Sequence, residues 1–270
     1  MTDPLAQPEA WNAVATGYDE LCFEALPELT ERAIAVVSPA PSMAILDVGT
    51  GPGTFALRVA PRVERVVAID FADKMIAQLR ARLEREKIAN VDPQVMDGQA
   101  LAFRDASFDA VVSMFGWFMF PDRARGLAEF HRVVRRGGRV LVTSWAPPDR
   151  NRVLGAAMFA MREALPDLPR PAGPLPTQIP EVCAEEMRAA GFAEVSVTIV
   201  HGTIRYPSVA AYWDAMERAG APMAMLRKNL GDAAWQAAAE RARAALRSQY
   251  GDGAVTLDAE AIFTTGVRSD

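Results

Sequence analysis

Short apolar segments alternate with amphipathic ones between residues 43 and 145, and this order limits the fold more than any other feature of the chain. Short apolar runs are typical of buried strands, whereas longer segments with apolar residues every three or four positions are typical of helices. Apolar strands separated by helices belong to parallel sheets that are covered on both faces. The expected strands are 43–48, 65–70, 91–96, 108–115 and 139–145, and the expected helices are 54–60, 72–87 and 123–134.

The pattern changes on both sides of this region. Residues 9–37 have helical spacing that ends at Pro39, so we expect N-terminal lid helices there. After Trp145 we expect helices at 151–165, 181–190 and 207–250 (with a break at Pro222), and strands at 194–204 and 262–268. These complete a doubly wound α/β fold with a seven-stranded, mostly parallel sheet. Residues 1–270 would form a single domain, with a binding core at 40–150 and helical cap insertions at 151–178 and 207–252.

Composition excludes several classes of function. The net charge is −5, which does not favour a nucleic-acid partner, and we interpret the basic run from Arg132 to Arg139 as a solvated helix end and turn. Neither a signal peptide nor an apolar stretch of membrane-spanning length is found, which predicts a cytoplasmic protein without a membrane partner. The two cysteines, Cys22 and Cys183, are too few for a zinc site, so no metal is expected. We expect a monomer or a homodimer.

A glycine-rich loop, Asp47-Val48-Gly49-Thr50-Gly51-Pro52-Gly53, lies between the first strand and the following helix. In doubly wound sheets, ligands bind at the carboxyl ends of the strands, and glycines let the backbone approach them closely. The third glycine comes one residue earlier than in the dinucleotide fingerprint. Asp47, two residues before the first glycine, suits an ammonium group better than a pyrophosphate. Asp70 ends the second strand, where its carboxylate can accept both hydrogen bonds of a ribose diol.

Five segments in this order resemble the successive motifs of class I S-adenosylmethionine (SAM)-dependent methyltransferases. The similarity is to the ubiquinone/menaquinone-biosynthesis type and its small-molecule relatives, and it covers roughly residues 40–200. The segments are LDVGTGPG (46–53), AIDFADKM (68–75), MDGQALAF (96–103), FDAVVSMFGWFMFPD (108–122) and EFHRVVRRGGRVLVTSW (129–145).

The resemblance implies that SAM is the cofactor and S-adenosylhomocysteine the product. Asp47 would then lie near the amino group of SAM, Asp70 would bind the ribose hydroxyls, and Asp97 would accept a hydrogen bond from the adenine amine. Tyr18 would close over the cofactor from the N-terminal segment. The full set of expected cofactor-binding residues is Tyr18, Asp47, Gly49, Thr50, Gly51, Gly53, Asp70, Phe71, Met75, Asp97, Gly98, Gln99, Ser113 and Met114.

The acceptor of the methyl group is expected beside an aromatic run that follows the fourth strand, because aromatic faces pack well against flat apolar molecules. The expected substrate-pocket residues are Trp117, Phe118, Trp145 and Met158. No general base stands out; His201 is retained as a candidate. The predicted reaction is in-line methyl transfer to a small hydrophobic or aromatic metabolite.

Two alternatives stay open at this point. One is a SAM-binding partner subunit without catalytic activity, which the acidic residues alone do not exclude. The other is an NAD(P)-dependent oxidoreductase, which the glycine spacing and Asp47 disfavour. The sequence names neither the acceptor nor the atom that is methylated, since fold does not determine substrate.

Overall fold

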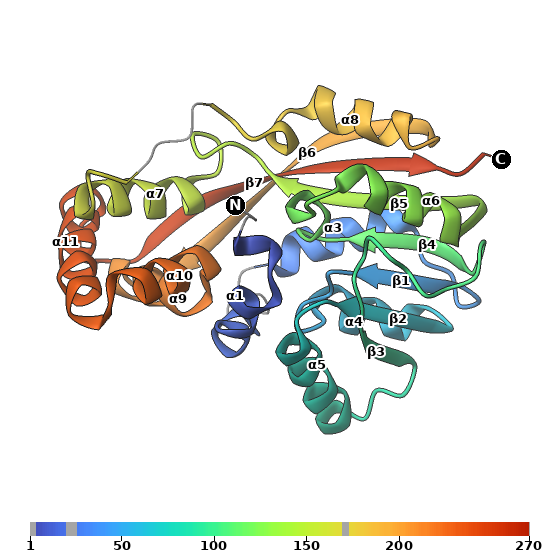
Figure 1. The fold of residues 1–270 in the computed structure, drawn as a ribbon, viewed down its shortest axis with the longest axis horizontal. Coiled ribbons are helices and arrows are strands. Elements are labelled where there is room, and N and C mark those ends of the chain that lie inside the picture. Colours follow the sequence, from blue (N-terminus) through green and yellow to red (C-terminus); the bar gives the residue numbers. More distant parts are fainter. Residues whose placement is uncertain (1–3, 20–25, 169–172, 270) are drawn as a thin grey trace.

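The computed structural model describes residues 4–19, 26–168 and 173–269. A seven-stranded sheet runs through the molecule in the order β3-β2-β1-β4-β5-β7-β6 (Figure 1). Strands β1 to β5 pair in parallel, and β7 is antiparallel to both β5 and β6. The predicted seven-stranded, mostly parallel fold is confirmed. The strands are β1 Ala44–Val48, β2 Arg65–Asp70, β3 Val91–Val95, β4 Phe108–Ser113, β5 Val134–Trp145, β6 Ala193–Tyr206 and β7 Val255–Val267.

Helices cover both faces of the sheet because successive residues of the central strands point to opposite sides. Ile45 of β1 packs with α3, α4 and α5, whereas Leu46 packs with α6 and α8 on the other face. None of the helices in the described ranges is long and apolar enough to cross a membrane. The helices are α1 Pro8–Asn12, α3 Pro27–Val37, α4 Thr54–Val59, α5 Asp73–Glu86, α6 Arg123–Val133, α7 Arg152–Ala164, α8 Pro180–Ala189, α9 Val209–Ala219, α10 Ala221–Leu230 and α11 Asp232–Tyr250.

The N-terminal segment differs from the continuous helical pattern expected over residues 9–37. Helix α1 ends at Asn12, residues 15–19 are again helical, and α3 begins at Pro27. Proline is favoured in the first turn of a helix but lacks the N–H that an interior position needs, so Pro27 starts a new helix. Residues 20–25 of the predicted helix, including Cys22, lie outside the described residues.

The carboxyl-terminal half also differs in detail from the prediction. The expected break at Pro222 is wrong by two residues, because the chain interrupts its helices at Gly220 and Gly231 and Pro222 lies in the first turn of α10. Strands β6 and β7 are longer than the sequence indicates and pair from Tyr206↔Val255 to Ala193↔Val267. Their extension carries the sheet well past the core.

A second apolar cluster surrounds this extension. Helices α7, α9, α10 and α11, which we call the helical cap, gather with it at the left of Figure 1. Trp213 of α9 and Trp235 of α11 are fully buried, and their indole N–H groups donate to the two carboxylate oxygens of Glu217 at 3.1 and 2.7 Å. Arg243 donates to the same carboxylate at 3.0 Å. This shared acceptor ties α9 to α11.

Candidate active site

The glycine loop after β1 closes against the loop after β4. Gly49 and Gly51 have φ angles of +66° and +55°, which glycine adopts without steric cost. A Cβ atom on Gly49 would lie 3.1 Å from the Cα atom of Gly116, so the two backbones are almost in contact. Both loops line a cavity at the carboxyl edge of the sheet.

Two buried carboxylates flank the glycine loop. Asp70 accepts hydrogen bonds from the backbone N–H of Gly51 at 2.8 Å and of Ala72 at 2.9 Å, and its side chain is 7% exposed. Asp47 accepts a bond from the Thr50 hydroxyl at 2.6 Å. Burial raises the pKa of Asp70 to about 6 and that of Asp47 to about 7, since desolvation disfavours the charged form. A cationic ligand bound beside these carboxylates would lower both pKa values, because a nearby positive charge favours the ionised form.

A cavity at this edge, the loop cavity, collects most of the predicted cofactor residues. Asp47 and Thr50 line a smaller hollow toward α3, together with Thr54. Gly53 and Ser113 support the loops from below: Gly53 packs on Leu79, and the Ser113 hydroxyl accepts a bond from the backbone N–H of Trp117 at 2.9 Å. The predicted residues that line the loop cavity are Tyr18, Gly49, Gly51, Asp70, Phe71, Met75, Asp97, Gly98, Gln99 and Met114.

The segment that carries Asp97 is fixed by side chains around it. The Asp97 carboxylate accepts from the backbone N–H of Gln99 at 2.9 Å, and the Gln99 amide oxygen accepts from the backbone N–H of Asp122 at 2.9 Å. These bonds hold the turn against the start of α6. They leave the Asp97 side chain exposed at the rim of the loop cavity.

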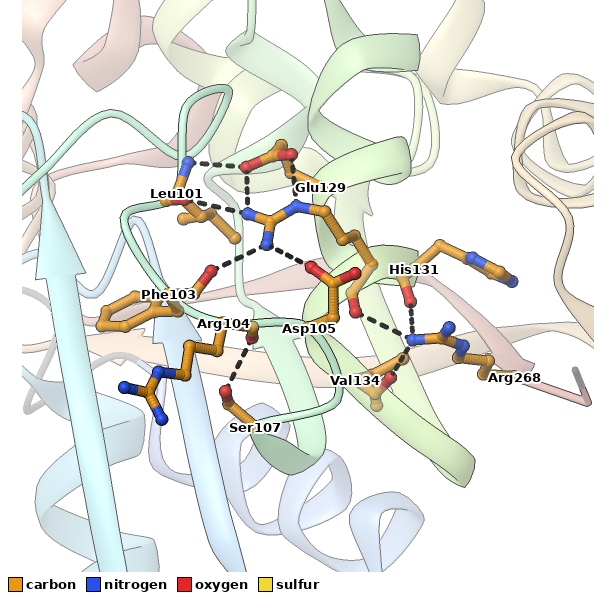
Figure 2. Close-up of polar contacts among 10 residues, drawn as sticks. Leu101, Phe103, Arg104, Asp105, Ser107, Glu129, His131, Val134 and Arg268 are labelled. Atoms are coloured by element: carbon orange, nitrogen blue, oxygen red, sulfur yellow. Dashed lines mark hydrogen bonds and ion pairs between the residues drawn. The ribbon is translucent and has the colours of Figure 1, made fainter.

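Beyond this turn, Arg132 of α6 holds the connection between β3 and β4, and Figure 2 labels its partners Leu101, Phe103, Asp105 and Glu129. Its guanidinium donates to the carbonyl oxygens of Leu101 and Phe103 at 2.9 and 2.7 Å, and it pairs with Glu129 and Asp105. Arg268 donates to three backbone carbonyls at the end of α6 in the same view. Arg132, which the sequence placed in a solvated basic run, is therefore a structural cross-link.

A second cavity, the cap cavity, adjoins the first beneath the helical cap. Trp11, Tyr18, Phe115 and Met119 line both cavities. The other lining residues come mainly from the cap, from β6 and from β7, and they are mostly apolar. Of the predicted substrate-pocket residues, Phe118 and Trp145 line this cavity.

Phe115 lines both cavities, although it is not among the site residues predicted from the sequence. Its ring stacks on Trp145 with centroids 3.8 Å apart, and its backbone N–H donates to the Thr143 hydroxyl at 2.9 Å. Its φ of +57° is costly for a side chain with a Cβ, and such backbone strain clusters at functional sites. The aromatic run includes Phe115, but the run does not reveal which ring turns inward.

Three other predicted residues lie elsewhere. Trp117 is 1% exposed and packs in the core, because the short helix that it starts turns its ring toward α6, where its indole N–H donates to the carbonyl of Arg123. Met158 lies one turn beyond Leu154, and Leu154 lines the cap cavity instead. His201 is 70% exposed on β6 and contacts Glu260 in a separate surface hollow, so it is not placed to act as a base in either cavity.

Comparisons with known proteins agree with this geometry. The methyltransferase domain family matches residues 45–138. Nocamycin O-methyltransferase from Saccharothrix syringae is 30% identical over 227 residues, which are 74% of this chain and 81% of that protein. The chain belongs to the class I SAM-dependent methyltransferases.

Two further comparisons bear on the methyltransferase and its fold. Demethylmenaquinone methyltransferase from Deinococcus radiodurans is 32% identical over 163 residues, covering 55% of this chain and 67% of that protein. The crystal structure of the YcgJ protein from Bacillus subtilis superposes with a TM-score of 0.59 at 20% identity, covering 89% of this chain and 98% of that chain. The similarity to the YcgJ structure shows the fold of the chain.

The side chains at the loop cavity fit the cofactor of this methyltransferase. SAM supplies an electrophilic methyl group and carries two positive charges, on its sulfonium and its ammonium group. Two buried carboxylates with raised pKa values, Asp70 in the loop cavity and Asp47 in the hollow beside it, offer acceptors for the hydroxyl groups and the ammonium group of such a molecule. The buried hydroxyl of Thr54 has no hydrogen-bond partner among the described residues and lines the same hollow as Asp47, so a polar ligand would complete its bonding.

The pH dependence of the methyltransferase should reflect these carboxylates. We expect SAM to bind more tightly as pH rises from about 5 to about 7.5, because Asp70 and Asp47 become ionised with pKa values of about 6 and 7. The free energy of unfolding of the unliganded protein should fall over the same rise, since both pKa values lie above those of the unfolded chain. Calorimetric titration across this range measures the first effect, and urea denaturation measures the second.

The control is Asp47→Asn, which removes the group with the higher pKa. Its SAM affinity should depend less on pH above about 6, where Asp47 titrates in the wild type. Equal pH profiles for the two proteins would contradict the assignment.

Proposed function

We propose that this methyltransferase passes the methyl group of SAM to a flat, apolar small molecule held in the cap cavity. The observation that carries the proposal is the shared wall of Trp11, Tyr18, Phe115 and Met119 between the two cavities. Because these side chains line both cavities, a donor in one cavity and an acceptor in the other would lie next to each other there. Holding the reactants in line and excluding water can then supply much of the rate enhancement.

On the donor side, the proposal gives each acidic residue one role. Asp70 accepts the hydrogen bonds of the ribose hydroxyls with carboxylate oxygens that Gly51 and Ala72 hold in place. Asp47 faces the amino group, and Asp97 receives the adenine amine at the rim. Phe71 and Met75 pack beside the adenine ring, and the backbone at Gly49 lies against the methionine part.

On the acceptor side, the described walls are mostly apolar and aromatic, and the ionisable groups that they present are the phenols of Tyr18 and Tyr206. The relatives named above, an O-methyltransferase of nocamycin and a demethylmenaquinone methyltransferase, support a small-molecule acceptor. The absence of nucleic-acid partners, the cytoplasmic location and the choice between monomer and homodimer stay predictions from the sequence.

Calorimetry and methyl transfer together test the proposal. SAM and S-adenosylhomocysteine should bind with one site per chain, and NADH should give no signal. Saturable NADH binding without SAM binding would overturn the assignment in favour of the oxidoreductase alternative. Transfer of labelled methyl from SAM to members of a library of flat aromatic metabolites would exclude the inactive partner subunit, and failure across the library would favour it.

A further inference from the structure

Asn151, a buried polar side chain among the described residues that line the cap cavity, uses only half of its hydrogen-bonding capacity. Asn151 follows β5 and precedes α7, is 1% exposed, and lines the cavity. Its Oδ1 accepts from the backbone N–H of Leu154 at 3.2 Å, as the N-cap residue of α7. Its Nδ2 has no hydrogen-bond partner among the described residues.

The geometry around Asn151 fixes which side-chain atom is the oxygen. Only an oxygen can accept from the N–H of Leu154, so the NH₂ group must be on the other branch. The backbone is held as well, because the Asn151 N–H donates to the carbonyl of Pro147 at 2.8 Å and its carbonyl accepts from Gly155 at 2.8 Å. The N-cap bond therefore keeps the NH₂ group on the branch that does not face the Leu154 N–H.

A buried donor without a partner is costly, and such groups in native proteins call for an explanation. Around Asn151 the cavity walls are apolar, with Val153, Leu154 and Ile204 among them. A ligand that filled the cavity with hydrocarbon alone would leave Nδ2 unsatisfied, whereas a ligand with an oxygen at this point would satisfy it. The amino end of α7, a helix of 13 residues, adds a positive potential that favours an oxygen rich in negative charge.

We infer that Asn151 selects methyl acceptors that present a carbonyl or hydroxyl oxygen to its Nδ2 amide, a conclusion that rests on the proposed function. The acceptor is a flat apolar molecule with an oxygen substituent at the end that lies under α7. Asn151 contacts the acceptor and determines specificity without taking part in bond making. A site built to hydrogen-bond an oxygen discriminates strongly against an analogue that lacks this oxygen. An apolar pocket discriminates much less against an analogue that lacks one methylene group.

The test uses two bicyclic compounds that differ by one oxygen, 1-tetralone and tetralin. Dissociation constants are measured by saturation-transfer NMR in the presence of S-adenosylhomocysteine. Wild-type protein should bind the ketone at least about tenfold more tightly than the hydrocarbon, the value of one hydrogen bond. Asn151→Asp and Asn151→Ser both retain an N-cap oxygen but lose the amide donor, and both should abolish the preference.

Ser208→Ala is the matched control, because Ser208 is the N-cap residue of α9 and does not line the cap cavity. It should lower stability without changing the preference for the ketone. A preference that survives in both Asn151 variants, equal binding of the two compounds by the wild type, or no binding of either overturns the inference. SAM titration of the same proteins separates the two ideas: wild-type protein that fails to bind SAM would refute the proposed function instead.

Discussion

Asp70→Asn is expected to weaken SAM binding about a hundredfold without unfolding the protein. The carboxylate has two acceptor oxygens positioned by Gly51 and Ala72, whereas an amide has one oxygen and would turn an NH₂ group toward a backbone N–H or the ligand. A hydrogen bond to a charged group contributes about 1.5–3 kcal/mol, so losing one such bond to SAM accounts for a weakening of up to about a hundredfold. Calorimetric titration with SAM measures it.

The control for this variant is Asp92→Asn. Asp92 lies on the neighbouring strand β3 but is exposed and does not line the loop cavity. Its SAM affinity should equal that of the wild type. If Asp70→Asn changed the affinity less than about threefold, Asp70 would have no place in the cofactor site.

Trp235→Ala is expected to lower the free energy of unfolding by about 3–5 kcal/mol, the usual loss for deleting a fully buried aromatic side chain. The substitution empties the centre of the helical cap and removes one of the three donors to Glu217. Urea denaturation measures the loss. SAM affinity should change little while the protein is folded, because the core and the N-terminal segment supply the walls of the loop cavity.

Leu230→Ala serves as the comparison in the same cap. Leu230 ends α10 and is 37% exposed, so its truncation should change stability by less than about 0.5 kcal/mol. A loss of less than about 1 kcal/mol for Trp235→Ala would show that the cap contributes little to folding.

The order of strands and helices was predictable from the sequence because buried strands and amphipathic helices have different periods. Asp47, Asp70 and the glycines were found for a related reason: the carboxyl ends of parallel strands bring together residues that are far apart in the chain. The structure places Asp70 and the glycines Gly49 and Gly51 around one cavity, with Asp47 in the hollow beside it.

Side-chain direction was the part that sequence could not supply. Trp117 and Phe115 are two residues apart in one aromatic run, yet Trp117 turns into the core and Phe115 toward the cavities. The difference follows from the left-handed backbone at Phe115 and the short helix after it. Asn151 was missed for another reason. In the sequence it is an ordinary N-cap residue, and only the surrounding cavity shows that its second polar atom is unused.

The antiparallel pairing of Tyr206 with Val255 has a consequence for how such a protein can change its substrate. The chain leaves the sheet after Tyr206, forms helices α9, α10 and α11, and returns to the sheet at Val255. This segment is therefore an enlarged hairpin connection. A replacement of any length could join these two residues without disturbing the strand register. New acceptor specificity could therefore be acquired by exchanging this insertion as a unit, while the half of the molecule that holds the methyl donor is inherited unchanged.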